Sequence, residues 1–223
     1  MSGLVCLQGG AEFGPTCASV DRRLLRLHPG PVVLVPLAAK PGWEYDTAGA
    51  NGARWYGRLG ATQVTVAPDA RRGPAEHAET VAMLAEAALV VLPGGSPARL
   101  LDAFASTGLD ADLHDVLARD GALCGASAGG MVLCEQTIVP EQGPPRLVPG
   151  LGIVPGVCVL PHYRNGPPTW LHTVTLPPSI RALGIPECTG VLVEPDGLSW
   201  VGPVPAVWVS AAGTVEPLPP ASA

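Results

Sequence analysis

The chain has 223 residues, including 28 glycines and 26 prolines, and a formal net charge of −6. Hydrophobic residues make up 47% of it and charged residues 14%, a balance that excludes an intrinsically disordered chain and favours one folded domain. The acidic balance, with Lys40 as the only lysine, gives no electrostatic case for a nucleic-acid or membrane partner, and no apolar run is long enough to span a bilayer.

The first 135 residues alternate short apolar runs with helical patterns. In chain order, strands are expected at Leu4–Leu7, Pro31–Leu37, Gln63–Val66, Ala88–Leu92 and Gly121–Cys124. The segments between them predict helices at Val20–Leu27, Tyr45–Leu59, Ala75–Ala87, Pro97–Ala105 and Asp110–Arg119. Strands without polar alternation, separated by helices, indicate a mainly parallel sheet sandwiched by helices, a doubly wound α/β fold. Ligands bind such sheets at the carboxyl ends of the strands.

After residue 139 the texture changes, because most of the prolines lie there and short β-type segments follow one another. Examples are Val157–Leu160, Gly190–Val193 and Leu198–Val201. We expect antiparallel strands from this C-terminal third to extend the same sheet within a single domain of residues 1–216. The tail, residues 217–223, is expected to fray.

Two glycine-rich turns follow predicted strands. Gly125-Ala126-Ser127-Ala128-Gly129 matches G-x-S-x-G at a strand-to-helix turn, which holds a serine hydroxyl above the sheet. The free N–H groups of the helix beginning at Ala128 can bind a developing anion. Simple helix capping by Ser127 is the alternative. The glycine N–H groups of Gly94-Gly95-Ser96-Pro97, after the neighbouring strand, can supply a second arm of an oxyanion hole, although an ordinary turn has the same composition.

A serine nucleophile needs a base, and the chain has five histidines. His162 ends the apolar run Val157–Pro161 and precedes a glycine turn, a position that suits a catalytic side chain. His172, in a segment that reads as helix, is the fallback.

Taken together, these segments resemble the serine peptidases of the dipeptidase E and cyanophycinase family, peptidase family S51. The resemblance includes Gly94 to Leu101, Gly125 to Met131, Pro149-Gly150-Leu151-Gly152 and Pro161-His162-Tyr163, and runs from Gly9 to about Glu194. It implies a class I glutamine amidotransferase-like fold, with Ser127 as nucleophile and His162 as base. Gly130 departs from the family, which usually has alanine there.

The third member of the triad is less clear. The family places an acid between the nucleophile and the histidine, and we favour Glu141 over Glu135, which lies about two helical turns past Ser127. Glu187 resembles a family position in Gly-Ile-Asp-Glu, and we expect it to line the site or to be structural.

The resemblance implies a serine hydrolase that cleaves a short peptide or isopeptide containing aspartate through an acyl-enzyme on Ser127. The N–H groups of Gly95 and Ala128 would bind the oxyanion. Gly94 and Ser96 are expected at the substrate. Arg164 would pair with a substrate carboxylate, and an exposed arginine without that role is equally compatible.

Three alternative functions remain. A lipase of the α/β-hydrolase type is disfavoured, because that fold places its catalytic histidine late in the chain and no histidine follows His172. A glutamine amidotransferase is disfavoured, because it needs a cysteine at the position of Ser127 and Cys124 lies three residues too early. A non-catalytic relative that binds a small molecule or a protein partner is the more serious rival.

The remaining expectations concern compartment, cofactors and partners. The N-terminal residues lack the pattern of a signal peptide, and the six cysteines are scattered without metal-ligand spacing. We therefore expect a cytoplasmic protein with no metal and no cofactor. Its partner would be a small peptide substrate, and the sequence leaves a homodimer open.

Overall fold

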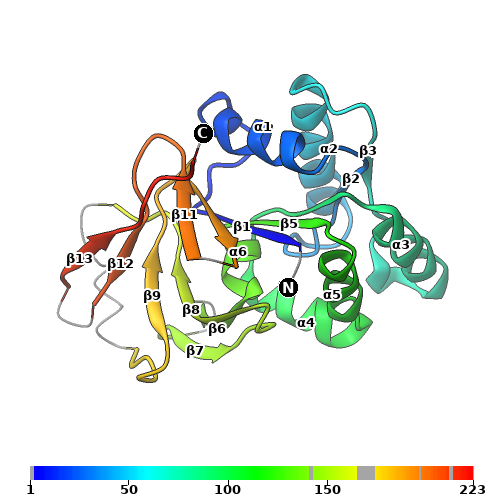
Figure 1. The fold of residues 1–223 in the computed structure, drawn as a ribbon. Coiled ribbons are helices and arrows are strands. Elements are labelled where there is room, and N and C mark those ends of the chain that lie inside the picture. Colours follow the sequence, from blue (N-terminus) through cyan, green and yellow to red (C-terminus); the bar gives the residue numbers. More distant parts are fainter. Residues whose placement is uncertain (1–2, 141–142, 165–173, 196, 211–212, 223) are drawn as a thin grey trace.

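The computed structural model describes residues 3–140, 143–164, 174–195, 197–210 and 213–222, and it contains two sheets that share one apolar core (Figure 1). The first sheet has the strand order β11-β10-β1-β5-β4-β2-β3. Its strands are β1 (Leu4–Gln8), β2 (Val32–Leu34), β3 (Val64–Val66), β4 (Leu89–Leu92), β5 (Ala122–Ala126), β10 (Gly190–Glu194) and β11 (Gly197–Val201). The neighbouring strands β1, β5, β4, β2 and β3 pair in parallel. At the other edge, β10 pairs antiparallel with β1, and β11 pairs antiparallel with β10.

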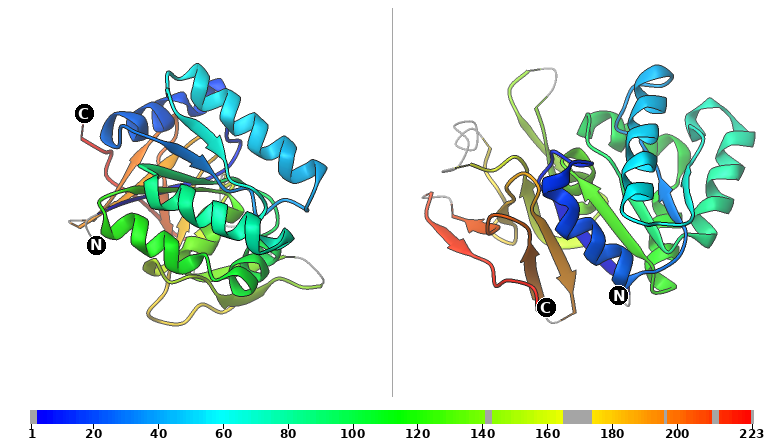
Figure 2. Two further views of the ribbon diagram at one scale, coloured as in Figure 1. Left: turned by 90° about the vertical axis from the view of Figure 1, so that its right-hand side faces the viewer. Right: turned by 90° about the horizontal axis from the view of Figure 1, so that it is seen from above.

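Helices cover both faces of this sheet, as the absence of polar alternation predicts (Figure 2). One face carries α1 (Ala18–Leu27) and α2 (Trp43–Arg58), with the short 3₁₀ turn η1 (Pro15–Cys17) before them. The other carries α3 (Pro74–Glu86), α4 (Pro97–Thr107), α5 (Asp110–Ala118) and α6 (Ala128–Leu133), with η2 (Ala70–Arg72). On β1, Leu4 and Cys6 pack on the side of α1 and α2. Val5 and Leu7 pack on the side of α3 to α6. The α/β fold with a mainly parallel, helix-covered sheet is confirmed.

The C-terminal third differs in part from expectation, because only β10 and β11 extend the first sheet. The other strands form a second sheet in the order β13-β12-β9-β8-β6-β7. They are β6 (Cys134–Val139), β7 (Arg146–Pro149), β8 (Val154–Leu160), β9 (Arg181–Gly184), β12 (Val207–Val209) and β13 (Val215–Pro217). β6, β8 and β9 pair in parallel, and their buried side chains pack on the face of the first sheet that α6 also covers. The sequence pattern marked these segments as strands but did not show which sheet they join.

Residues 217–222, which were expected to fray, make contacts with the rest of the fold. Leu218 is buried, and the N–H of Trp200 donates to the carbonyl of Pro219 at 3.0 Å. The N–H of Ala221 donates to the carbonyl of Trp200 at 2.9 Å. The tail is held because β11 has a free edge whose backbone groups it satisfies.

The two sheets meet at the carboxyl ends of their parallel strands. The N–H of His162, after β8, donates to the carbonyl of Gly9, after β1, at 2.7 Å. The N–H of Ile185, after β9, donates to the carbonyl of Leu160 at 3.0 Å. Segments that follow β1, β5, β8 and β9 are therefore gathered at one edge, where a ligand is expected to bind.

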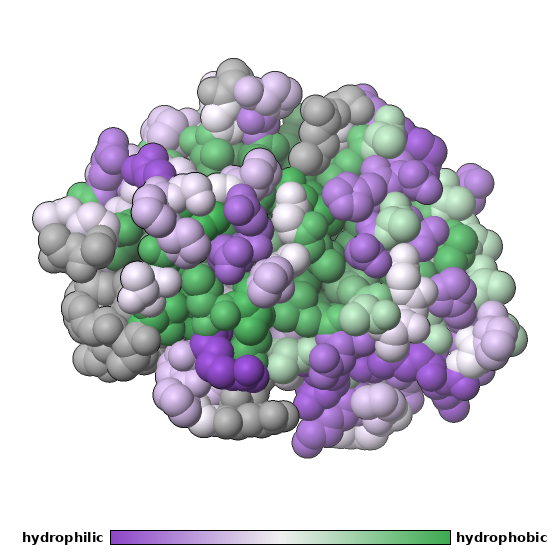
Figure 3. All heavy atoms as spheres, turned by 90° about the horizontal axis from the view of Figure 1, so that it is seen from below, coloured by the Kyte–Doolittle hydropathy of each residue, from purple (hydrophilic) through white to green (hydrophobic). Residues whose placement is uncertain are grey.

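The surface seen from below carries an apolar area bordered by hydrophilic residues (Figure 3). Among the described residues, no helix has the length and apolar character needed to cross a membrane.

Candidate active site

Ser127 lies on a strained turn between β5 and α6. Its φ of 48° and ψ of −110° lie where non-glycine residues are rare, and its N–H donates to the carbonyl of Gln8 at 2.9 Å. A Cβ at Gly125 would lie 2.5 Å from the carbonyl carbon of Gly129, and one at Gly129 would lie 2.2 Å from the carbonyl oxygen of Leu92. The small residues of the motif are therefore required by close backbone packing. The Ser127 side chain makes no cap hydrogen bond to α6, which argues against simple helix capping.

His162 brings its imidazole to this serine. Its Nε2 lies 3.0 Å from the Ser127 Oγ, and its backbone is also left-handed, with a φ of 53°. The ring packs directly on Gly10, where a Cβ would lie 2.3 Å from the Cε1 of His162. The fallback histidine, His172, lies outside the described residues.

The carboxylate that meets the second ring nitrogen of His162 belongs to Glu187. Its Oε1 lies 3.0 Å from Nδ1, and the turn that carries it follows β9. Glu141 lies outside the described residues, and Glu135 accepts the N–H of Gly156 at 2.7 Å in the second sheet. Arg164 places its guanidinium 4.0 Å from the same Glu187 oxygen, with 84% of its side chain exposed.

Gly95 and Ala128, whose N–H groups are the expected oxyanion donors, lie beside Ser127. All three line one cavity of about 460 Å³ together with His162. Across the described part of the chain, the N–H of neither residue donates a hydrogen bond. A Cβ at Gly95, whose φ is 148°, would lie 2.6 Å from the carbonyl oxygen of Ala38. Gly95 is thus packed tightly enough to fix the direction of its N–H.

Gly94 and Ser96, expected at the substrate, have partners within the fold. The N–H of Gly94 donates to the carboxylate of Glu12 at 2.8 Å, and the Ser96 hydroxyl accepts the N–H of Arg99 at 3.1 Å as the N-cap of α4. Glu12 was not among the residues predicted for the site, although it follows Gly9-Gly10 at the end of the first strand. That carboxylate holds the backbone of Gly94, the residue before Gly95.

A buried polar cluster centred on Asp21 includes the side chain of Gln8, the residue whose carbonyl accepts the N–H of Ser127. The Asp21 carboxylate accepts hydrogen bonds from Gln8 Nε2 at 2.7 Å, Trp55 Nε1 at 2.7 Å and the Tyr56 hydroxyl at 3.2 Å. Burial raises the pKa of the Asp21 carboxyl, and the hydrogen bonds from Trp55, Gln8 and Tyr56 oppose that rise. The side chain of Gln8 therefore belongs to this cluster, and the backbone carbonyl of Gln8 accepts the N–H of Ser127.

The described residues contain no group of three or more His, Cys, Asp or Glu side chains that could hold a metal ion.

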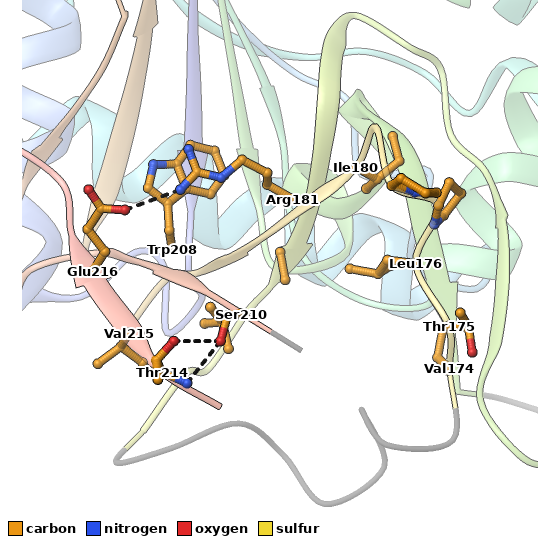
Figure 4. Close-up of a pocket in the computed structure, with 14 residues that line it drawn as sticks. Val174, Thr175, Leu176, Ile180, Arg181, Trp208, Ser210, Thr214, Val215 and Glu216 are labelled. Atoms are coloured by element: carbon orange, nitrogen blue, oxygen red, sulfur yellow. Dashed lines mark hydrogen bonds and ion pairs between the residues drawn. The ribbon is translucent and has the colours of Figure 1, made fainter. Parts of the chain in front are cut away.

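A second cavity, of about 570 Å³, lies beside β9, β12 and β13 (Figure 4). Arg181 stacks over the Trp208 ring at 4.0 Å and lies 3.4 Å from Glu216. The hydroxyls of Ser210 and Thr214, which also line this cavity, form a hydrogen bond with each other at 2.6 Å. No histidine is among the described residues that line it, whereas His162 and Ser127 both line the smaller cavity.

The fold and the site define an α/β protein that presents a hydrogen-bonded serine, histidine and glutamate at the carboxyl ends of its strands. Two solved structures share the fold. A peptidase from an acI-B1 Actinobacterium superposes with a TM-score of 0.80 at 22% identity, covering 99% of this chain and 95% of that one. A putative peptidase E protein from Listeria monocytogenes EGD-e gives a TM-score of 0.65 at 15% identity, covering 91% and 99%.

The sequence places the chain more narrowly. The family model described as Peptidase family S51 matches residues 6–201. The chain therefore belongs to this family. A cyanophycinase from Synechococcus elongatus is 28% identical over 205 residues, which make up 87% of this chain and 64% of that protein. The chain thus spans less than two thirds of this relative's length. The resemblance to family S51 in the sequence motifs is confirmed.

Proposed function

We propose that the chain is a serine hydrolase that cleaves a short peptide or isopeptide through an acyl-enzyme on Ser127. The observation that carries the proposal is the continuous chain from Ser127 Oγ through both ring nitrogens of His162 to Glu187, with both contacts at 3.0 Å. A nucleophile within hydrogen-bond reach of a base that is itself oriented by a third group is the arrangement that covalent catalysis requires. Membership in a peptidase family points to an amide substrate.

In the first half of the reaction, Ser127 Oγ attacks the amide carbonyl while His162 Nε2 accepts the hydroxyl proton. The carbonyl oxygen becomes an oxyanion, which the N–H groups of Gly95 and Ala128 bind. Each such donor contributes roughly 3–4 kcal/mol where it has been measured in other enzymes. The C–N bond then breaks, and His162 gives its proton to the departing amine.

In the second half, water attacks the ester on Ser127 and His162 again accepts a proton. The serine leaves with that proton, and a carboxylic acid is released. We assign the third role to Glu187 in place of Glu141, because Glu187 reaches Nδ1. Its carboxylate selects the tautomer that leaves Nε2 free to accept a proton, and it stabilises the imidazolium that forms.

Labelling with a fluorophosphonate probe tests the proposal. The probe should attach to Ser127 in the wild type, and Ser127→Ala and His162→Ala should abolish attachment while keeping the thermal unfolding temperature near that of the wild type. A folded wild type that takes up no probe would favour the alternative, a non-catalytic relative that binds a small molecule or a protein.

Two further features stay predictions. The cytoplasmic compartment and a homodimer rest on the sequence analysis alone.

A further inference from the structure

Glu12 lies close to the proposed nucleophile, in the segment that follows β1. Its carboxylate accepts the N–H of Gly94, which follows β4, at 2.8 Å. A Cβ built on Gly94 would lie 2.9 Å from Glu12 Oε1 and 3.3 Å from the Cβ of Ser127. Gly94 therefore stands between the carboxylate and the nucleophile, close to both.

The segment that carries Glu12 is strained on both sides of this residue. Ala11 has a φ of 56° and Phe13 a φ of 65°, which lie in the left-handed region that non-glycine residues rarely adopt. The Cys17 thiol donates to the carbonyl of Ala11 at 3.1 Å and holds it in this conformation. Strained residues persist only where their surroundings determine them, and they cluster at functional sites. The strain around Glu12 is thus a first indication that the position of its carboxylate serves the site.

The turn after β4 contains three successive N–H groups with different partners. The N–H of Gly94 donates to Glu12, and the N–H of Ser96 donates to the carbonyl of Ala38 at 3.0 Å. Between them, the N–H of Gly95 donates to no atom of the described residues. Gly95 lines the cavity that also contains the nucleophile. The two flanking bonds therefore hold the turn while the middle N–H stays available to an oxygen in the cavity.

The N–H of Gly95 belongs to the peptide unit that joins Gly94 to Gly95. Glycine adopts positive and negative φ about equally readily, so a peptide unit between two glycines can rotate with little steric hindrance. On the Gly95 side, the close packing against Ala38 limits this rotation. On the Gly94 side, the restraint is the bond to Glu12. A hydrogen bond to a carboxylate is roughly twice as strong as one between neutral groups, which suits it to fix a unit without side chains.

We propose that Glu12 is a positioning residue of the oxyanion hole: its carboxylate fixes the Gly94–Gly95 peptide unit so that the N–H of Gly95 faces the oxyanion formed at Ser127. Glu12 acts through the backbone and not on the substrate itself. Oxyanion donors are effective because their direction is set before the reaction begins. Loss of Glu12 therefore slows the chemical step and leaves substrate binding largely intact. The inference rests on the proposed function and adds a positioning residue to it.

The test measures the rate constant of fluorophosphonate labelling, together with kcat and KM for an activated ester. Attack of Ser127 on phosphorus, like attack on a carbonyl, places developing negative charge on an oxygen, so both rates depend on the oxyanion donors. In Glu12→Ala, the labelling rate constant and kcat should fall at least about tenfold, a part of the 10²–10³-fold that loss of a whole donor causes. The KM should stay within about twofold, because the lost interaction acts in the transition state. Glu12→Gln keeps an oxygen acceptor and should label at least about threefold faster than Glu12→Ala.

Glu135→Ala is the matched control. Glu135 also accepts the N–H of a glycine, Gly156, at 2.7 Å, but this bond lies within the second sheet and neither residue lines the cavity. Its labelling rate constant should stay within about twofold of the wild-type value, because distant sites act independently. All rates are expressed per folded chain, as measured by circular dichroism. If Glu12→Ala does not fold, Glu12→Asp, whose carboxylate is one methylene shorter, takes its place and should label at least about threefold more slowly than Glu12→Gln.

The outcomes separate this inference from the proposed function. Labelling of folded Glu12→Ala within about twofold of the wild type, an equal loss in Glu12→Gln, or an equal loss in Glu135→Ala overturns the role of Glu12. A loss of kcat/KM that comes entirely from KM overturns it as well. In each of these cases the serine hydrolase still stands, because Ser127 takes up the probe. A folded wild type that takes up no probe overturns both.

Discussion

Ser127 and His162 both adopt left-handed backbone conformations, and two consecutive carbonyls at the end of β1 hold them there. The carbonyl of Gln8 accepts the N–H of Ser127, and that of Gly9 accepts the N–H of His162. A strained backbone persists only where its surroundings determine it, and such residues cluster at functional sites. The Gln8–Gly9 pair thus sets the spacing between the proposed nucleophile and its base.

The role of Glu187 is tested by Glu187→Gln. Loss of the charge beside Nδ1 should lower kcat by about 10²–10⁴-fold, because the imidazolium loses its counter-charge and the favoured tautomer changes. The rate of hydrolysis of an activated ester measures this effect. Glu194→Gln, on β10, is the control and should change the rate less than about twofold. A larger loss in Glu141→Gln than in Glu187→Gln would return the assignment to Glu141.

Gly10 gives a second prediction at this scale. Gly10→Ala would place a Cβ 2.3 Å from the His162 ring and should lower kcat at least about tenfold by displacing the imidazole. Gly60→Ala is the matched control, because Gly60 also has a positive φ but open space around its Cβ position. Both variants should lose about 1–2 kcal/mol of unfolding free energy from backbone strain. Equal activity losses would contradict the role of the ring contact.

At the scale of elements, the Asp21 cluster ties α1 and α2 to β1. Asp21 belongs to α1, Trp55 and Tyr56 to α2, and Gln8 to β1. The carboxylate is buried on all sides, so its ionisation is linked to folding.

Asp21→Asn removes this linkage. Because burial raises the pKa of Asp21 in the folded state, the folded protein binds more protons than the unfolded one between the ordinary pKa near 3.9 and the raised value. The unfolding free energy contributed by this group therefore falls as pH rises through that window, by up to about 1.4 kcal/mol per pH unit. In urea unfolding measured from pH 4 to pH 7, the unfolding free energy of the wild type should fall relative to that of Asp21→Asn. A difference that rises with pH would contradict the raised pKa.

At the scale of the whole molecule, the site is divided between the two sheets. Ser127 and Gly95 follow β5 and β4 of the first sheet, and His162 and Glu187 follow β8 and β9 of the second. The shared core fixes the distance between these pairs, so a change that shifts one sheet against the other alters the Ser127–His162 contact directly.

The cysteines give a test of the fold as a whole. All six are free and buried, and burial raises the pKa of the Cys158 thiol to about 12 and that of Cys134 well above its ordinary value. A thiol reagent at pH 8 should therefore modify less than one cysteine per native chain and all six in urea. Activity towards the ester should be unaffected by the reagent under native conditions. Rapid modification of a native thiol would contradict this packing.

The sequence by itself determined the parallel, helix-covered sheet and the tight strand-to-helix turn at Ser127, because hydrophobic periodicity and glycine-rich turns are local properties of the chain. It also singled out His162, at the end of an apolar strand. Only the tertiary structure decided that Glu187 meets His162, since the parallel pairing of β8 with β9 brings together residues 25 positions apart. The same holds for Glu12 and Gly94, which are 82 positions apart. Strand pairing depends on the packing of the whole core, and no local pattern encodes it.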